Sequence, residues 1–192
     1  MNQVIKLTKP QEPWIGARGR IAVILPSTNI GVEYDCQRLI PPGVSWHFCR
    51  FYVEQPDLSN DNMFLAFIDA IRDTIPNAMR DAMTCEPSQI MMGMSAETFW
   101  GGLEGNAEFT TRLREVAGDE IGITTGANAL DASLKAFGAK KVAALTPYQP
   151  VGDEQVHRFL EETGYEVSKV VGLKCDTAVS YTHLTLPTNR EV

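Results

Sequence analysis

The sequence of 192 residues lacks several features that would assign a function at sight. Neither glycine-rich phosphate-binding pattern, GxGxxG or GxxxxGK[ST], follows a predicted strand. The GxSxG pattern of many serine hydrolases is also absent. The cysteines at 36, 49, 85 and 175 form no CxxC pair, so neither a zinc site nor a disulfide framework is indicated.

Long apolar runs and clusters of basic residues are missing as well. No window approaches the ~18 apolar residues of a membrane span, and the N-terminus has no signal-like apolar segment. The formal net charge is −7 with scattered Lys and Arg, which argues against a nucleic-acid partner. With 44% hydrophobic residues the chain can bury a core, and a cytoplasmic protein with no membrane partner is expected.

Short apolar runs alternate with segments of helical periodicity along most of the chain. This alternation, with about six strands, predicts an α/β fold whose parallel sheet is flanked by helices. Pro76 is expected to kink or end the second helix. The strands are predicted at 21–25, 44–53, 89–94, 121–124, 141–145 and 167–173, and the helices from 31 and at 61–75, 104–116, 127–137 and 154–162.

Polar clusters follow four of the predicted strands, at the edge where such sheets carry their sites. They read Pro26-Ser27-Thr28-Asn29, Gly93-Met94-Ser95, Thr124-Thr125-Gly126 and Thr146-Pro147-Tyr148. Each cluster alone is typical of helix caps and turns. Together they offer hydroxyl groups and backbone N–H donors, which suit a carboxylate better than a metal ion.

Three ionisable residues are weaker candidates for chemistry. Glu97 is placed to act as a base beside Ser95, but the first turn of a helix explains it better. His47 is expected to be a packed or edge residue within a strand, and His157 to be solvated on a helix. A Ser-His-Asp triad therefore cannot be assembled from these residues.

The strand-end motifs "ILPSTN", "MGMS", "TTGANAL" and "LTPY", in this order, resemble the aspartate/glutamate racemase superfamily, and within it the branch of maleate cis-trans isomerases and arylmalonate decarboxylases. The resemblance implies two similar α/β lobes with parallel sheets flanked by helices and a site between them. We expect a first lobe at 1–118 with its lead-in and an incomplete second lobe at 119–179. The segment 180–192 resembles translated adapter sequence and is expected to be foreign.

The same resemblance implies a site that uses no metal or organic cofactor. Gly93 occupies a position where racemases and isomerases carry a cysteine and arylmalonate decarboxylases carry glycine. Gly93, Met94, Ser95 and Tyr148 are expected to bind a substrate carboxylate, with Asn29 as a further contact. A wider pocket is expected to include Pro26, Ser27, Thr125 and Asn128. The catalytic cysteine of the second lobe is expected beyond the sequence, because Cys175 comes too early.

The glycine at position 93 favours a cofactor-independent decarboxylase that acts on a small α-substituted malonate or dicarboxylate through an enediolate. The alternatives are a maleate cis-trans isomerase, a racemase of the Asp/Glu type, or a carboxylate-binding protein without catalysis. Because a partial second lobe leaves apolar faces at its strands uncovered, self-association of the chain is also expected.

Overall fold

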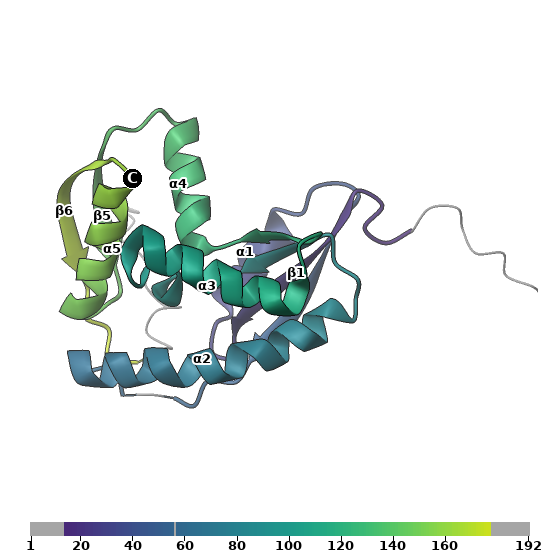
Figure 1. Ribbon diagram of the computed structural model, residues 1–192, viewed down its shortest axis with the longest axis horizontal. Helices are drawn as coiled ribbons and strands as arrows, with labels where there is room; N and C mark the ends of the chain where they lie inside the picture. Colours follow the sequence, from purple (N-terminus) through teal and green to yellow (C-terminus); the bar gives the residue numbers. More distant parts are fainter. Residues whose placement is uncertain (1–13, 56, 178–192) are drawn as a thin grey trace, which may run out of the picture.

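A computed structural model describes residues 14–55 and 57–177, which form an α/β structure of parallel strands flanked by helices (Figure 1). The larger sheet has four strands in the order β2-β1-β3-β4, and the smaller sheet pairs β5 with β6. The first sheet contains β1 (Gly19–Pro26), β2 (Val44–Phe51), β3 (Gln89–Met92) and β4 (Gly122–Thr124). The second contains β5 (Lys141–Thr146) and β6 (Glu166–Gly172).

The first sheet is built around β1, which is buried on both faces. Its residues from Ala22 to Leu25 have no exposed surface, as expected for an apolar strand between two parallel neighbours. Helix α2 (Asp61–Met83) packs on β1 and β2, α3 (Gly102–Ala117) packs on α2 and β4, and α1 (Gly31–Arg38) contacts β2. The register pairs Ile24 with Met92, which brings the loops after β1 and β3 to the same edge of the sheet.

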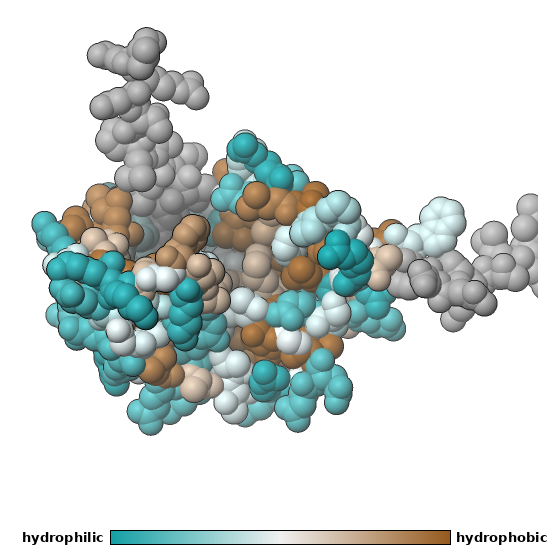
Figure 2. Space-filling view, turned by 90° about the horizontal axis from the view of Figure 1, so that it is seen from above, coloured by the Kyte–Doolittle hydropathy of each residue, from teal (hydrophilic) through white to brown (hydrophobic). Residues whose placement is uncertain are grey.

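The second sheet is covered on one side by α5 (Pro150–Glu162), while α4 (Gly126–Ala136) connects it to the first sheet. Its other side keeps Leu145 and Val171, which pair across the two strands, in contact with solvent, and Leu173 just after β6 is exposed as well. Apolar surface lies on both sides of a hollow between the two lobes (Figure 2). The expectation of uncovered apolar residues on the strands of the second lobe is therefore confirmed for β5 and β6.

The strand at 122–124 lies in a different sheet from the one expected. The division of the chain at 118 and 119 places it in the second lobe, but β4 pairs with β3 in the first sheet, with Ile123 opposite Ile90. Ile90 is fully buried, and pairing with β4 covers an edge of β3 that would otherwise be open. The crossing to the second sheet therefore follows β4, through α4.

Of the two alternatives expected at Pro76, a kink or an end of the second helix, the end is wrong. Helix α2 runs for 23 residues and contains Pro76 in its interior. Proline removes one backbone hydrogen bond, yet Ile75 and Met79 on either side are buried against the core. Burial of this face compensates for the loss and keeps the helix continuous.

Three expectations from the sequence concern the segment 180–192, membrane-spanning helices and metal sites. The segment 180–192 lies outside the described residues. Within 14–55 and 57–177, no helix combines the length and the apolar character that a membrane crossing requires. Over the same ranges, no three His, Cys, Asp or Glu side chains gather closely enough to hold a metal ion.

Candidate functional site

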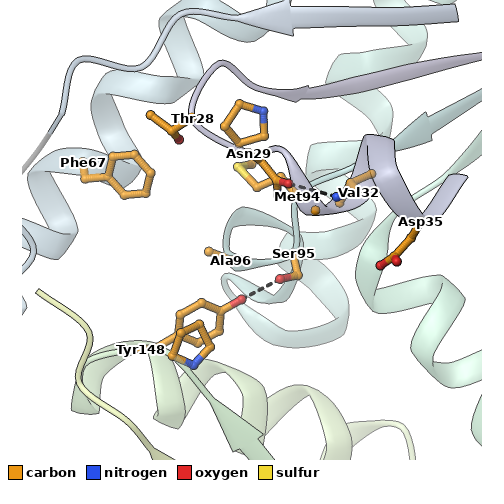
Figure 3. Close-up of a pocket in the computed structure, with 12 residues that line it drawn as sticks. Thr28, Asn29, Val32, Asp35, Phe67, Met94, Ser95, Ala96 and Tyr148 are labelled. Carbon is orange, nitrogen blue, oxygen red and sulfur yellow. Dashed lines mark hydrogen bonds between the residues drawn. The ribbon is translucent and has the colours of Figure 1, made fainter. Parts of the chain in front are cut away.

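A cavity of about 380 Å³ lies between the two lobes, where the loops after β1, β3 and β5 meet (Figure 3). The first lobe contributes most of its walls and the second lobe contributes the loop after β5. The lining residues are Pro26, Thr28, Asn29, Gly31, Val32, Asp35, Phe67, Met94, Ser95, Ala96, Pro147 and Tyr148. Five residues that the sequence analysis proposed for the site therefore meet in one cavity: Pro26, Asn29, Met94, Ser95 and Tyr148.

Gly93 forms the base of the loop after β3 and has little room for a side chain. Its N–H donates to the carbonyl of Ile24 at 2.7 Å, so this group is not available to a ligand. A Cβ atom at position 93 would lie 3.0 Å from Val32 Cγ1 and 3.1 Å from the Cβ of Leu25. Gly93 thus acts by letting the loop pass close to β1 and α1, while Met94 and Ser95 face the cavity.

Ser95 and Tyr148 form a polar contact across the two lobes. The Ser95 Oγ and the Tyr148 hydroxyl lie 2.6 Å apart, and Figure 3 shows this hydrogen bond at the cavity. Tyr148 is 5% exposed, and burial raises the pKa of its phenol to about 12. Tyr148 is therefore a neutral hydrogen-bond donor near pH 7 rather than a base.

Asn29 lines the cavity with one half of its amide already engaged. Its Oδ1 accepts from the Val32 N–H at 3.1 Å and so serves the first turn of α1 (Figure 3). The Asn29 carbonyl accepts from Arg50 Nη1 at 2.8 Å, which holds the loop from β2. The Nδ2 group of Asn29 is the part of this side chain suited to donate to a carboxylate.

Ser27 lies in the same loop but does not line the cavity. Its Oγ accepts from the Val53 N–H at 2.9 Å and lies 3.4 Å from the Val53 carbonyl. Ser27 therefore joins the end of β1 to the chain after β2. Its role is to stabilise this turn, as the sequence pattern also allowed, and not to line the cavity.

Thr125 and Asn128, also expected in the pocket, lie at the N-terminus of α4 and outside the cavity lining. Thr125 is buried and its Oγ1 accepts from the Asn128 N–H at 3.1 Å, as an N-cap. The Ala127 N–H donates to Thr98 Oγ1 at 3.1 Å, and the Ala129 N–H donates to the Thr125 carbonyl. The N–H groups of Ala127, Asn128 and Ala129 are therefore already paired and are not available to a ligand.

Two lining residues, Phe67 and Asp35, were not predicted as site residues from the sequence. Phe67 reaches the cavity from α2, where it also belongs to the apolar stripe of that helix. Asp35 lies on α1 and is the only Asp, Glu, Lys or Arg among the described lining residues. Both depend on how α1 and α2 are placed by the sheet, which local spacing does not reveal. The described lining therefore offers neutral hydrogen-bonding groups, apolar surface and one carboxylate, and no Lys or Arg side chain.

Glu97 is buried behind the site loop and is 1% exposed. Arg72 on α2 binds it through two hydrogen bonds, at 2.7 and 3.1 Å, and Arg112 on α3 lies 3.4 Å away. Burial raises the pKa of the Glu97 carboxyl, and the two arginines oppose this effect. Glu97 occupies the first helical turn after Ser95, as expected, but its partners make it an anchor of the loop.

The remaining candidates lie away from the cavity lining. Cys175 is buried, and burial raises the pKa of its thiol, with Asp176 adding to the effect. His47 is packed in β2 with Nε2 at 2.9 Å from Ser45 Oγ. His157 is partly exposed on α5, with Nδ1 at 3.4 Å from a Glu161 carboxylate oxygen. These placements agree with the packed and solvated roles expected for the two histidines.

Two curated relatives match most of the chain. The maleate isomerase of Nocardia farcinica (strain IFM 10152) is 27% identical over 154 residues, which is 78% of this chain and 59% of the relative. The maleate isomerase of Alcaligenes faecalis is 24% identical over 163 residues, covering 81% of this chain and 63% of the relative. The chain thus spans about three fifths of the length of these relatives.

Solved structures share the fold. A Nocardia farcinica maleate cis-trans isomerase variant with a covalently bound succinylcysteine intermediate superposes with a TM-score of 0.73 at 23% identity, covering 84% of this chain and 66% of that one. An arylmalonate decarboxylase variant with glycine-to-cysteine and cysteine-to-serine substitutions gives a TM-score of 0.61 at 19% identity, covering 82% and 63%. These likenesses confirm the α/β fold of the aspartate/glutamate racemase type.

A family profile decides the relationship. The profile described as arylmalonate decarboxylase matches residues 39–185, which is more than half of the chain and includes the loops after β3 and β5. The expected resemblance to this branch is therefore confirmed. The chain belongs to the arylmalonate decarboxylase family.

Proposed function

We propose that this chain carries the carboxylate-binding half of a cofactor-independent cytoplasmic enzyme that decarboxylates a small α-substituted malonate. The observation that supports this most directly is the Ser95–Tyr148 hydroxyl pair, 2.6 Å apart at the wall of the cavity between the lobes. A carboxylate that enters this cavity meets donors from both lobes. The proposal assigns no proton donor among the described residues.

The donors suit the charge that develops during decarboxylation. Loss of CO₂ from a malonate leaves an enediolate, with negative charge on the oxygens of the remaining carboxylate. The Ser95–Tyr148 pair spends one hydroxyl proton on its mutual hydrogen bond and can donate the other toward that charge, together with the Asn29 Nδ2 group. A preorganised donor of this kind typically contributes ~3 kcal/mol to the barrier.

Gly93 favours decarboxylation over proton transfer. Racemisation and cis-trans isomerisation each need a base or a nucleophile on one face of the substrate, whereas loss of CO₂ forms the carbanion without a base. Position 93 offers no reactive side chain, and a Cβ atom there would crowd Val32 and Leu25. Phe67 and Met94 add apolar surface against the departing carboxylate.

Maleate isomerisation is the second candidate, and one observation favours it. The two curated relatives described above are maleate isomerases. Asn29 also lines the cavity, and its motif Pro26-Ser27-Thr28-Asn29 resembles the isomerase branch more than the decarboxylase branch. This reaction would need a group other than position 93 for its first step. Asp35 is the acidic side chain in the lining, and substitution of Asp35 by Asn would test it. Binding of a carboxylate without turnover is the third candidate.

The test follows both substrates with the purified chain. Release of ¹³CO₂ from labelled phenylmalonate and loss of the vinyl proton signals of maleate are recorded by NMR, together with the dissociation constant of each acid. Ser95→Ala and Tyr148→Phe are expected to weaken binding of phenylmalonate by about tenfold or more. Ser133→Ala and Tyr52→Phe, at exposed positions, are the matched controls and should bind like the wild type.

The outcomes separate the candidates. Release of CO₂ supports the decarboxylase, and loss of maleate without CO₂ release replaces it with the isomerase. Binding of phenylmalonate that depends on Ser95 and Tyr148, without turnover, leaves the carboxylate-binding function alone. Failure of both acids to bind at millimolar concentration refutes the proposal. Light scattering on the same sample tests self-association through the exposed side of β5 and β6, where a monodisperse monomer would contradict it.

A further inference from the structure

A buried polar network lies directly behind the cavity, and carboxylate binding does not use it. At its centre is Thr98, which has no exposed surface. The Thr98 Oγ1 donates to the carbonyl of Ser95 at 2.7 Å and accepts from the N–H of Ala127 at 3.1 Å. One hydroxyl therefore joins the site loop after β3 to the first turn of α4.

Asn106 on α3 joins the same two segments from a second direction. Its Nδ2 donates to the carbonyl of Thr98 at 2.8 Å and to the Oγ1 of Thr125 at 3.0 Å. Asn106 is 5% exposed, so both bonds are shielded from water. Buried networks in which the members are paired hold a single geometry more strictly than exposed ones.

The two segments also touch through their backbones. A Cβ atom at Gly126, the first residue of α4, would lie 3.2 Å from the Cα of Ser95 and 3.3 Å from the carbonyl oxygen of Met94. Gly93 makes a similarly close approach to Val32 on the other side of the loop. The loop that carries Ser95 is therefore held between α1 and the start of α4.

We propose that Thr98 is the positioning residue of the site: by tying the Ser95 carbonyl to the N-terminus of α4, it places the Ser95 hydroxyl against Tyr148. Helix α4 leads from the first sheet into the second, so this link couples the placement of Ser95 to the seating of the second lobe. Glu97 does not provide such a link, because its described partners, Arg72 and Arg112, lie on α2 and α3.

One part of this inference rests on the proposed function and one part does not. If the site binds a carboxylate, loss of the Thr98 hydroxyl weakens binding without removing a group that contacts the ligand. The geometry of the Ser95–Tyr148 hydrogen bond depends on Thr98 whether or not a carboxylate binds. The two parts are therefore measured separately.

The experiment compares Thr98→Val, which keeps the shape and removes the hydroxyl, with Thr98→Ser, which keeps the hydroxyl. Protein labelled with ¹³C at tyrosine Cζ reports the hydrogen bond of Tyr148, whose signal is assigned with Tyr148→Phe. The signal in Ser95→Ala marks the broken bond. We expect Thr98→Val to move the Tyr148 signal toward that position and Thr98→Ser to leave it at the wild-type position.

Binding of phenylmalonate is measured on the same samples, well below their melting temperatures. Thr98→Val is expected to bind about fivefold more weakly or worse, and Thr98→Ser to bind like the wild type. Gly126→Ala provides a second route to the same effect, because it pushes on Ser95 without removing a hydrogen bond. It is expected to move the Tyr148 signal as well.

An unchanged Tyr148 signal in folded Thr98→Val refutes the positioning role, even if the variant is less stable. If Thr98→Val does not fold, an unchanged signal in Gly126→Ala refutes it instead. A wild-type protein that binds no phenylmalonate, combined with a shifted signal in Thr98→Val, rejects the proposed function and supports the positioning role.

Discussion

The ion pair behind the site loop is strongly asymmetric, and this asymmetry predicts different costs for removing its two halves. Glu97 is 1% exposed, whereas the side chains of Arg72 and Arg112 are 36% and 51% exposed. Water can therefore solvate either arginine without its partner, but it cannot reach the carboxylate. Removing Arg72 leaves a buried charge with one long contact, to Arg112 at 3.4 Å.

Arg72→Met is expected to lower the free energy of unfolding by ~3 kcal/mol, the lower end of the range for breaking a buried pair. For a chain of this size, that corresponds to a melting temperature lower by about 6–12 °C. Glu97→Gln keeps the size and one acceptor and leaves an arginine that water can solvate, so about 1 kcal/mol is expected. Arg80→Met, at an exposed position on the same helix, is the control and should cost less than about 0.5 kcal/mol.

The deficit of Arg72→Met is expected to depend on pH. Burial raises the pKa of folded Glu97 above its ordinary value of 4.5, and loss of Arg72 removes the strongest opposing effect. A carboxyl whose pKa is higher in the folded state than in the unfolded state stabilises the protein at pH values below its unfolded-state pKa. This stabilisation is lost as the pH rises through the folded-state pKa. The variant should therefore approach wild-type stability below about pH 4.5 and differ most near pH 7.

Urea unfolding followed by tryptophan fluorescence between pH 4 and 8 measures these differences. The reasoning is refuted if Arg72→Met costs no more than Glu97→Gln at pH 7. It is also refuted if the deficit of Arg72→Met is the same at every pH, because the cost would then come from lost packing and not from a buried charge.

Three further predictions concern Gly93, Tyr148 and Cys175. Gly93→Ala is expected to lower the free energy of unfolding by about 1–3 kcal/mol through the close contact with Val32, and urea unfolding of a double-mutant cycle with Val32→Ala should show coupling between the two positions. Tyr148 is expected to titrate with a pKa of about 12 by its phenolate absorbance, and Ser95→Ala should move this titration to higher pH, because the Ser95 hydrogen bond lowers the pKa; a titration near pH 10 in the wild type would contradict the buried placement. Cys175 is expected to react slowly with a disulfide reagent at pH 7, because burial raises the pKa of its thiol, and Cys175→Ser should leave binding of phenylmalonate unchanged, whereas weaker binding would assign it a role in the site.

Much of the fold follows from short-range signals in the sequence. The apolar run at 21–25 and the stripe that begins at Phe64 identify the central strand and the long helix, because burial on both faces or on one face fixes the residue pattern. The meeting of Asn29 with Met94 and Ser95 was predictable as well, because β1 and β3 are parallel neighbours whose C-terminal ends lie at one edge. Tyr148 follows β5 in the second sheet, so its place in the same cavity was expected only from the family resemblance.

The remaining features depend on tertiary contacts that no local pattern encodes. Glu97 and Arg72 are 25 residues apart, and nothing in either segment marks them as partners. A threonine such as Thr125 is common both in polar pockets and at helix N-caps. Only the position of α4 shows that Thr125 is an N-cap here. Strand β4 has three residues, which is too short to reveal which of two sheets it joins. The local rule that proline ends a helix fails at Pro76, because the burial of its neighbours keeps α2 continuous.

The long helix α2 spans beneath both sheets, and this has a consequence for how the chain folds during synthesis (Figure 1). Its N-terminal end carries Phe64, whose ring lies 6.2 Å from that of Trp100 and 5.7 Å from that of Tyr148, and Gln149 donates to the carbonyl of Leu58 at 2.7 Å just before it. Tyr148 and Gln149 leave the ribosome after both α2 and β4, whereas Trp100 precedes β4. The first sheet can form once its last strand, β4, has been synthesised. At that stage Phe64 and Trp100 leave an aromatic surface exposed at the N-terminal end of α2. We expect the second lobe to assemble on that surface, so that the cavity between the lobes forms last.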